Sequence, residues 1–236
     1  MSATLSPALA LLLAAFPPQP GGAVPDARPE PLPREERTGP DDWLEKFPGP
    51  QDGFMLRLQS LCTGERYAGR MVSGDPRDAD MRGEPLTMGP ADCTLDDGRL
   101  TAIAIPFAVG DDASRTWRLS RTGVGIKLRH RHVLPDGTED PVSGYGGVAM
   151  SSGEGGGGTF TRQAFPADAE TRALFLREGL DASVANVWSV EIVPGDGFAY
   201  ALDRPGGDGG PRAFRAAFDL ARPLPREADQ AARADE

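Results

Sequence analysis

Short runs of alternating apolar and polar residues, separated by turn signals, fill most of the 236-residue chain after residue 66. In the clearest run, Ile103, Ile105 and Phe107 fall on one face, because successive side chains of a strand point to opposite sides. Gly-, Pro- and Asp-rich turns such as Pro135-Asp136-Gly137 follow the runs. The predicted strands are 67–73, 86–93, 99–109, 114–122, 126–134, a strand that ends near 145–147, 159–165, 184–193, 198–202 and 214–220.

Strands of this length and spacing, about eight to ten in number, are typical of an antiparallel sandwich or barrel. Successive hairpins without a long crossover favour an up-and-down antiparallel β-barrel over a Greek-key sandwich. Few helices are available to cover a parallel sheet, so an α/β fold is disfavoured. We therefore expect an all-β fold with minor α.

Two segments have helical periodicity, one at the start of the fold and one before the last strands. Over 52–62, Phe54, Leu58 and Leu61 lie on one helical face, which predicts a short amphipathic helix that closes the bottom of the fold. A second helix is predicted over 169–179, with Asp168 as its N-cap. Its expected apolar side consists of Ala169, Ala173, Leu174, Leu176 and Leu180.

The N-terminal residues have the features of an export signal. An apolar segment between Leu5 and Phe16 is too short to span a bilayer, and the small residues Gly21 and Ala23 follow it. We predict a signal peptide over 1–23 and, from its Pro-rich and charged composition, a flexible leader over 24–50. The β-barrel domain is expected over 51–224 and a polar tail over 225–236.

Cys62 and Cys93 are the only cysteines. In an exported chain an even pair predicts a disulfide, here between the end of the first helix and the second strand. With the predicted signal peptide, this pair indicates a periplasmic or secreted location.

The formal net charge of −10 limits the partners of the chain. Affinity for DNA or RNA depends largely on Lys and Arg that meet phosphates, so an acidic chain without a basic block is not expected to bind nucleic acid. No later segment is long and apolar enough to predict a membrane span. We expect a monomer that its charge keeps soluble.

The only two histidines lie two residues apart on one predicted strand. His130 and His132 share a face with Leu128, whereas Arg129 and Arg131 share the opposite face. Because cations do not pack in an apolar core, the arginines are expected to point to solvent and the histidines into the barrel.

Other strands place a few polar groups on the same inner face. Trp117 makes its face the inner one, and Arg121 on that face would approach the barrel wall or mouth from inside. Apolar walls with sparse polar groups are what a small-molecule pocket needs. The predicted ligand-binding residues are Trp117, Arg121, His130, His132, Asn186, Trp188 and Tyr200.

A filled interior is the plainer alternative, because a barrel of this size packs its interior with side chains. An inward histidine would then cap a carbonyl or pair with an acid such as Asp140 or Glu139. The H-x-H spacing also brings two imidazoles to one side, as zinc and copper sites require, but a third ligand would have to be an acid. We predict no metal site, and the sequence identifies no cofactor.

The chain contains no nucleophile-elbow, metalloprotease or phosphate-loop motif, and no residue is predicted to be catalytic. The leading expectation is an exported barrel that binds a small, partly apolar ligand in its interior. One alternative is a hydrolase or isomerase with His130 or His132 as general base at the barrel mouth, oriented by Asp140 or Glu139. Another is a structural, envelope-associated module with a packed interior.

Six blocks of sequence carry a resemblance to other proteins: S-R-T-W (114–117), R-H-R-H (129–132), D-G-T-E-D (136–140), Y-G-G (145–147), Q-A-F-P-A-D (163–168) and F-D-L (218–220). They resemble a group of small exported proteins of proteobacteria, over most of 56–223. The resemblance implies export and carries no activity to transfer. By architecture alone, a short opening helix followed by an antiparallel barrel also resembles lipocalin-like folds, which implies carriage of a ligand.

Overall fold

The computed structural model describes residues 49–150, 158–206 and 210–225, all within one compact unit, Pro40–Glu236. The predicted signal peptide, most of the predicted leader and most of the polar tail lie outside these residues. The strands of the described part are β1 (Tyr67–Met71), β2 (Leu86–Met88), β3 (Asp92–Asp96), β4 (Arg99–Val109), β5 (Asp112–Thr122), β6 (Gly125–His132), β7 (Gly146–Met150), β8 (Arg162–Pro166), β9 (Val187–Val193), β10 (Gly197–Arg204) and β11 (Arg212–Pro223).

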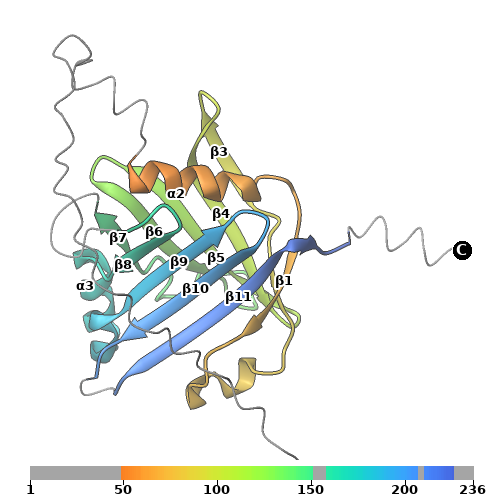
Figure 1. Ribbon diagram of the computed structural model, residues 1–236. Helices are drawn as coiled ribbons and strands as arrows, with labels where there is room; N and C mark the ends of the chain where they lie inside the picture. Colours follow the sequence, from red (N-terminus) through yellow and green to blue (C-terminus); the bar gives the residue numbers. More distant parts are fainter. Residues whose placement is uncertain (1–48, 151–157, 207–209, 226–236) are drawn as a thin grey trace, which may run out of the picture. The chain divides into compact units, whose positions relative to one another are not determined.

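The strands form a nearly closed antiparallel barrel. From β4 to β7, and again from β8 to β11, each strand pairs with the next strand along the chain. β1 joins the two halves, because it pairs with β2 on one edge and with β11 on the other. Ten strands lie on this path, and β3 adds to the free part of β4 (Figure 1). The predicted up-and-down barrel with minor α is confirmed.

The prediction of one strand over 86–93 was wrong, since two strands, β2 and β3, occupy this stretch and both pair with β4. The break falls at Gly89-Pro90. Gly89 has a φ of +86°, in the left-handed region that favours glycine, and Pro90 has no N–H for a ladder. Together these two residues interrupt the pairing.

The two halves of the barrel meet at β7, where the adjacent glycines Gly146 and Gly147 let the backbones of β6 and β8 approach closely. A Cβ on Gly146 would lie 2.0 Å from the carbonyl oxygen of Leu128 in β6, and one on Gly147 would lie 2.1 Å from that of Pro166 in β8. A bridge between Gly147 and Ala167 joins the two halves here. The predicted strand ending near 145–147 was therefore wrong, because β7 begins at Gly146 and residues 133–145 form a loop.

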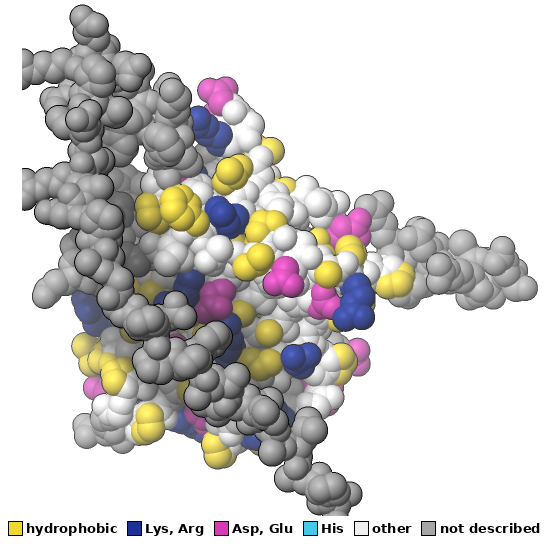
Figure 2. Space-filling model, viewed as in Figure 1, with side chains coloured by type: hydrophobic (Ala, Val, Ile, Leu, Met, Phe, Trp, Pro, Cys, Tyr) yellow, Lys and Arg dark blue, Asp and Glu magenta, His cyan; other side chains and the backbone are white. Residues whose placement is uncertain are grey.

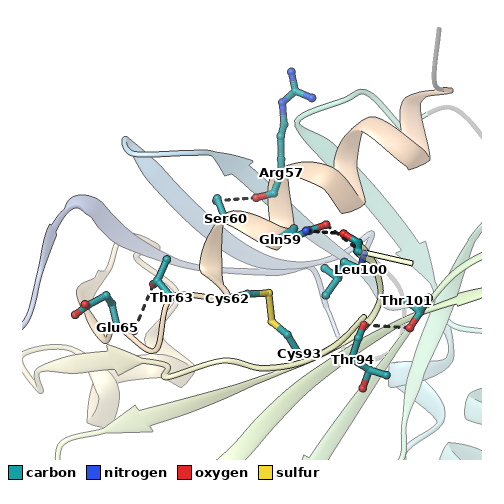
Figure 3. The surroundings of a disulfide bond; sticks show 11 residues. Arg57, Gln59, Ser60, Cys62, Thr63, Glu65, Cys93, Thr94, Leu100 and Thr101 are labelled. Carbon is teal, nitrogen blue, oxygen red and sulfur yellow. Dashed lines mark hydrogen bonds between the residues drawn. A yellow bond between two sulfur atoms is a disulfide. The ribbon is translucent and has the colours of Figure 1, made fainter. Parts of the chain in front are cut away.

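A helix covers one end of the barrel, as predicted. α2 (Pro50–Leu58) continues into the 3-10 segment η2 (Gln59–Leu61), and Phe54 and Leu58 are fully buried. Pro50 suits the first helical position, where its missing N–H leaves no bond unmade. The predicted disulfide between Cys62 and Cys93 is present and ties the end of η2 to β3 (Figure 3).

Gln59 adds a second tie at the same end. Its Nε2 donates to the carbonyl oxygen of Gly98 (2.9 Å), and its Oε1 accepts from the N–H of Leu100 (3.2 Å), as Figure 3 shows for Leu100. One side chain therefore satisfies two backbone groups of the β3–β4 hairpin.

The second helix, α3 (Ala169–Arg177), begins as predicted, with the Asp168 carboxylate accepting the N–H of Thr171 (2.9 Å). Its predicted apolar side was wrong. Thr171 and Phe175, one turn apart, are its buried residues, whereas Leu176 and Leu180 are exposed. The buried apolar contact of α3 is therefore made by the ring of Phe175.

Arg129 of β6 points outward as predicted, although α3 covers it and keeps it largely from solvent. Its Nη2 lies 2.7 Å from a carboxylate oxygen of Asp168 and 2.7 Å from one of Glu170. Both acids stand at the start of α3, where the helix dipole favours negative charge. This ion pair fixes the start of α3 against the outer face of β6.

Lys and Arg side chains are interspersed with Asp and Glu on the face seen in Figure 2. Two more 3-10 segments, η3 (Pro76–Met81) and η4 (Asp181–Ala185), complete the described part. Among the residues that the structure describes, no helix has the length and apolar character needed to cross a membrane.

Candidate functional site

A cavity of about 340 Å³ lies inside the barrel at the end away from α2. Strand β5 runs between the two ends. Arg115 and Trp117 at its start line the cavity, whereas Arg121, further along the strand, contacts Asp52 of α2. The rim includes residues of η3, of the 133–145 loop and of η4. The barrel thus has one end covered by a helix and one end with a hollow.

Six of the seven predicted ligand-binding residues come together in the wall of this cavity: Trp117, His130, His132, Asn186, Trp188 and Tyr200. Arg121 does not join them. Its Nε donates to the carbonyl oxygen of Leu100 (3.0 Å), and its guanidinium pairs with Asp52. It shares the inner face of β5 with Trp117, but four residues of strand separate them by about 13 Å. Strand alternation predicts which face of the sheet a side chain occupies. It does not predict how far along the barrel that side chain lies.

His130 is buried, and both of its ring nitrogens are engaged. Nδ1 lies 3.1 Å from the carbonyl oxygen of Tyr145, and Nε2 lies 2.6 Å from the hydroxyl of Tyr200. Because a carbonyl only accepts, Nδ1 carries the proton, and Nε2 accepts from the Tyr200 hydroxyl. Burial lowers the pKa of His130 to about 3, so the imidazole is neutral at physiological pH.

Tyr200 remains a neutral phenol. Burial raises the pKa of its hydroxyl well above the ordinary value. Its proton is committed to His130, which leaves lone pairs on the hydroxyl oxygen as acceptors. Burial likewise raises the pKa of Tyr145, whose ring stacks on His130 at 4.3 Å, to about 12. The inner part of the cavity therefore carries no ionised group from these three residues.

His132 stands nearer the opening, with 30% of its side chain exposed. Its Nδ1 lies 2.8 Å from Oδ2 of Asp140, in the loop that follows β6. The N–H of Val142 donates to the other oxygen of Asp140 (2.9 Å), and this bond, with His132, lowers the pKa of the Asp140 carboxyl. Glu139, the other acid considered from the sequence, accepts instead from Ser143.

Aromatic rings form two stacks in the cavity wall. Trp117 stacks on Phe107 (4.7 Å, 16°) and on Tyr200 (4.5 Å, 20°), while Tyr145 stacks on His130 (4.3 Å, 13°). The hydrogen bond between Tyr200 and His130 joins the stacks. The wall is therefore largely aromatic, and its rings support one another.

The charged residues at the opening are paired with one another. Arg212 lies 2.7 Å from buried Asp78 and 3.1 Å from Asp75. Arg115 pairs with Asp112 on its own strand. The positive charges of these two arginines are therefore offset by neighbouring carboxylates.

Asn186 lines the cavity, but its side-chain oxygen is itself buried and is one of four buried side-chain atoms without a partner in the described part, with those of Ser114, Gln163 and Ser189. It follows η4, the residue is 6% exposed, and its backbone oxygen accepts from the N–H of Ala167 (3.0 Å). Its side-chain Oδ1 has no hydrogen-bond partner among the described residues. Leaving such an acceptor unsatisfied costs about 1–3 kcal/mol, so a group kept in this state calls for an explanation.

The histidine pair does not form a shared metal site. Both nitrogens of His130 and one nitrogen of His132 are bonded to other groups. Within the described ranges, no three His, Cys, Asp or Glu side chains gather as metal ligands would.

Sequence reasoning missed several residues of the wall. Tyr145 was predicted only to lie near the end of a strand, yet its ring stacks on His130. Phe107 was expected to face inward but not at the site, and its stacking on Trp117 places it there. Phe175 of α3 and Arg212 of β11 also line the cavity. Strand alternation could have found Phe107, whereas the loop and helix residues gave no comparable signal.

Fold and site together define a β-barrel with an aromatic interior cavity at one end. Comparison with models of protein families, with curated proteins and with solved structures finds no match. The function must therefore be argued from the geometry of the cavity.

Proposed function

We propose that the protein binds a small, partly apolar molecule inside the barrel, in the cavity between Trp117, His130, Asn186 and Trp188. The observation that carries the proposal is a hollow inside the barrel whose inner wall is formed largely by aromatic side chains. Apolar walls supply burial, and a few convergent polar groups fix orientation in small-molecule sites. A hollow of about 340 Å³ also argues against a fully packed interior.

A periplasmic or secreted location remains part of this proposal. The Cys62–Cys93 disulfide is compatible with an oxidising compartment. Native mass spectrometry of protein isolated from its own host, before and after denaturation, tests whether a molecule is carried with the folded chain.

Fluorescence of a neutral apolar probe, N-phenyl-1-naphthylamine, tests the binding site directly. Ser183 of η4 lines the cavity, whereas Asp181 in the same segment is exposed and does not. We expect wild type and Asp181→Trp to bind the probe and Ser183→Trp, which fills the hollow, to lose at least about 90% of the signal, a tenfold weakening. Equal binding by all three proteins, or no binding by wild type, would contradict the proposal.

A second candidate function is catalysis at the opening. The contact between His132 Nδ1 and Asp140 (2.8 Å) is the arrangement that orients a histidine general base, and Nε2 has no hydrogen-bond partner among the described residues. No serine or cysteine bonds to that nitrogen there, so a hydrolase would activate water.

Hydrolysis of 4-nitrophenyl acetate and butyrate tests this candidate. His132→Ala and Asp140→Asn are expected to lower the rate by about 10²-fold or more if the pair acts as a base. The two variants are compared with Glu139→Gln, which leaves the His132–Asp140 contact in place. A wild-type rate equal to that of buffer removes the hydrolase from consideration.

A further inference from the structure

The charged side chains in the cavity wall are of one sign. In the described part of the chain, this wall includes Arg115, Arg131 and Arg212 but no Asp or Glu. The whole chain carries a formal net charge of −10, so an all-positive lining is not what its composition alone would produce. Because salt screens exposed charges beyond about 8–10 Å, the side chains next to a ligand matter more than the total charge.

Arg115 stands at the opening, on the inner face of β5. Its register partners are Phe107 of β4 and His132 of β6, and all three residues line the cavity. The charge of Arg115 also acts on the interior. Burial raises the pKa of the Tyr145 hydroxyl to about 12, and the positive charge of Arg115 works against this rise. The guanidinium is therefore close enough to the cavity to act on a group inside it.

The three arginines differ in how fully their donors are used. Both Nη atoms of Arg212 donate to the buried carboxylate of Asp78, and one of them lies 3.1 Å from Asp75. Arg131 belongs by alternation to the outer face of β6. Arg115 has one ion-pair partner, Asp112, which it meets through Nη1.

The pair with Asp112 leaves Arg115 able to bind a further anion. Its Nε and Nη2 have no hydrogen-bond partner among the residues that the structure describes. The side chains of Arg115 and Asp112 are 32% and 48% exposed, and ion pairs this exposed contribute little to stability. A guanidinium offers two parallel N–H groups to the two oxygens of a carboxylate, and the edge formed by Nε and Nη2 has that geometry.

Deeper in the cavity the wall offers no charge. Trp117, two residues after Arg115 on the same face of β5, is buried, as are Trp188 and Tyr200. His130 is neutral there, because burial lowers its pKa to about 3. A charged group at this depth would lose its hydration without gaining an opposite charge, whereas an apolar group would gain from burial.

On the basis of the function proposed above, we infer that the cavity binds an amphipathic monocarboxylate, with its apolar part inside and its carboxylate on Arg115 at the opening. Arg115 is then the residue that selects the head group. A single negative charge suits this position better than a double one, because Asp112 and Asp140 lie next to Arg115 and His132 at the opening.

Three eight-carbon compounds test the inference by isothermal titration calorimetry: octanoate, 1-octanol and octylammonium. They share an apolar chain and differ in the charge of the head group. An apolar hollow without a counter-ion would bind the alcohol most tightly, because charged groups are costlier to remove from water. We expect wild type instead to bind octanoate about tenfold more tightly than 1-octanol, and octylammonium least tightly.

Two arginines of β5 provide a matched pair of variants. Arg115→Met removes the charge and keeps a long side chain, so the preference for octanoate over 1-octanol should fall to about twofold or less. Arg118→Met changes an exposed arginine of the same strand that does not line the cavity, and it should retain the preference. Arg115→Gln serves if the methionine variant does not fold.

Binding of 1-octanol or octylammonium by wild type as tightly as octanoate would overturn the inference. So would an undiminished preference for octanoate in Arg115→Met. If N-phenyl-1-naphthylamine binds wild type and not Ser183→Trp, while octanoate has no advantage over 1-octanol, the inference fails and the proposed function stands. If neither that probe nor any of the three compounds binds wild type, both fail.

Discussion

The two ends of the barrel differ in how they are filled: α2 packs against one end, whereas the other end holds a cavity. At the α2 end, Arg121 bonds to Leu100 and Asp52, and Gln59 serves a donor and an acceptor of the β3–β4 hairpin. At the other end, Asn186 keeps a buried oxygen without a partner in the described part. A packed end is what stability alone would select, whereas the atoms that line a hollow lose packing contacts.

The largest effect is expected at the α2 end. Phe54→Ala removes a side chain that is 0% exposed and leaves a hole between α2 and the barrel, which should lower the free energy of unfolding by about 3–5 kcal/mol. Leu56→Ala, on the same helix but 64% exposed, should change it by less than about 0.5 kcal/mol. Urea denaturation followed by circular dichroism measures both. Similar losses would mean that α2 does not pack as described.

Removal of the disulfide should be the next largest effect. Cys62 and Cys93 close a loop with a sequence separation of 31, for which loop-closure entropy predicts a stabilisation of about 2–4 kcal/mol. The double variant Cys62→Ser/Cys93→Ser should unfold at lower urea concentration by that amount. Probe binding by the folded protein should persist, because the cavity lies at the other end. Loss of both together would show that the ends are coupled.

At the cavity end, His130 should make stability depend on pH. The folded protein holds this imidazole neutral, with a pKa lowered to about 3, whereas an unfolded histidine titrates near 6.5. The stabilisation is therefore present above about pH 6.5 and is lost as pH falls towards 3, by about 1.4 kcal/mol per pH unit. His130→Gln, which can still bond to Tyr145 and Tyr200, should flatten this part of the curve. Identical slopes in both proteins would refute a buried neutral histidine.

The smallest effect has the opposite sign. Asn186→Leu removes the unpartnered oxygen, so the ligand-free protein should gain about 1 kcal/mol of stability. Thermal unfolding of the two proteins measures it, with Ser183→Ala as a comparison from the same wall. A loss of stability instead would mean that the Asn186 amide is satisfied within the protein.

Strand positions and faces could be predicted from the sequence because they depend on local periodicity. The predicted limits of β4 coincide with those observed, and His130 and Trp117 face inward as alternation requires. Features set by tertiary contacts could not be predicted this way. Arg121 lies too far along β5 to reach the cavity, and Leu176 remains exposed because Phe175 makes the contact of α3 with the wall.

Contacts in the candidate site are also of two kinds: those between residues close in sequence could be predicted, and those between distant residues could not. The contact of His132 with Asp140 joins groups close in sequence, and Asp140 was one of the two acids predicted to pair with a histidine. The bond from Tyr200 to His130 joins residues that are far apart in the sequence, and no pattern in either strand indicates it. Tyr145 reaches the site only because the loop from 133 folds back, with the N–H of Gly144 donating to the His130 carbonyl (2.8 Å).

The position of β1 between β2 and β11 has a consequence for how the chain reaches its native state. β1 cannot complete its pairing until the last strand has formed, because β11 pairs with one of its two edges. Pairings between the beginning and end of a chain make folding slow, and until they form both strands present unpaired edges to other molecules. A chain cut before Arg212 would lack the closing strand, so it would expose two open edges, β1 and β10, and tend to aggregate.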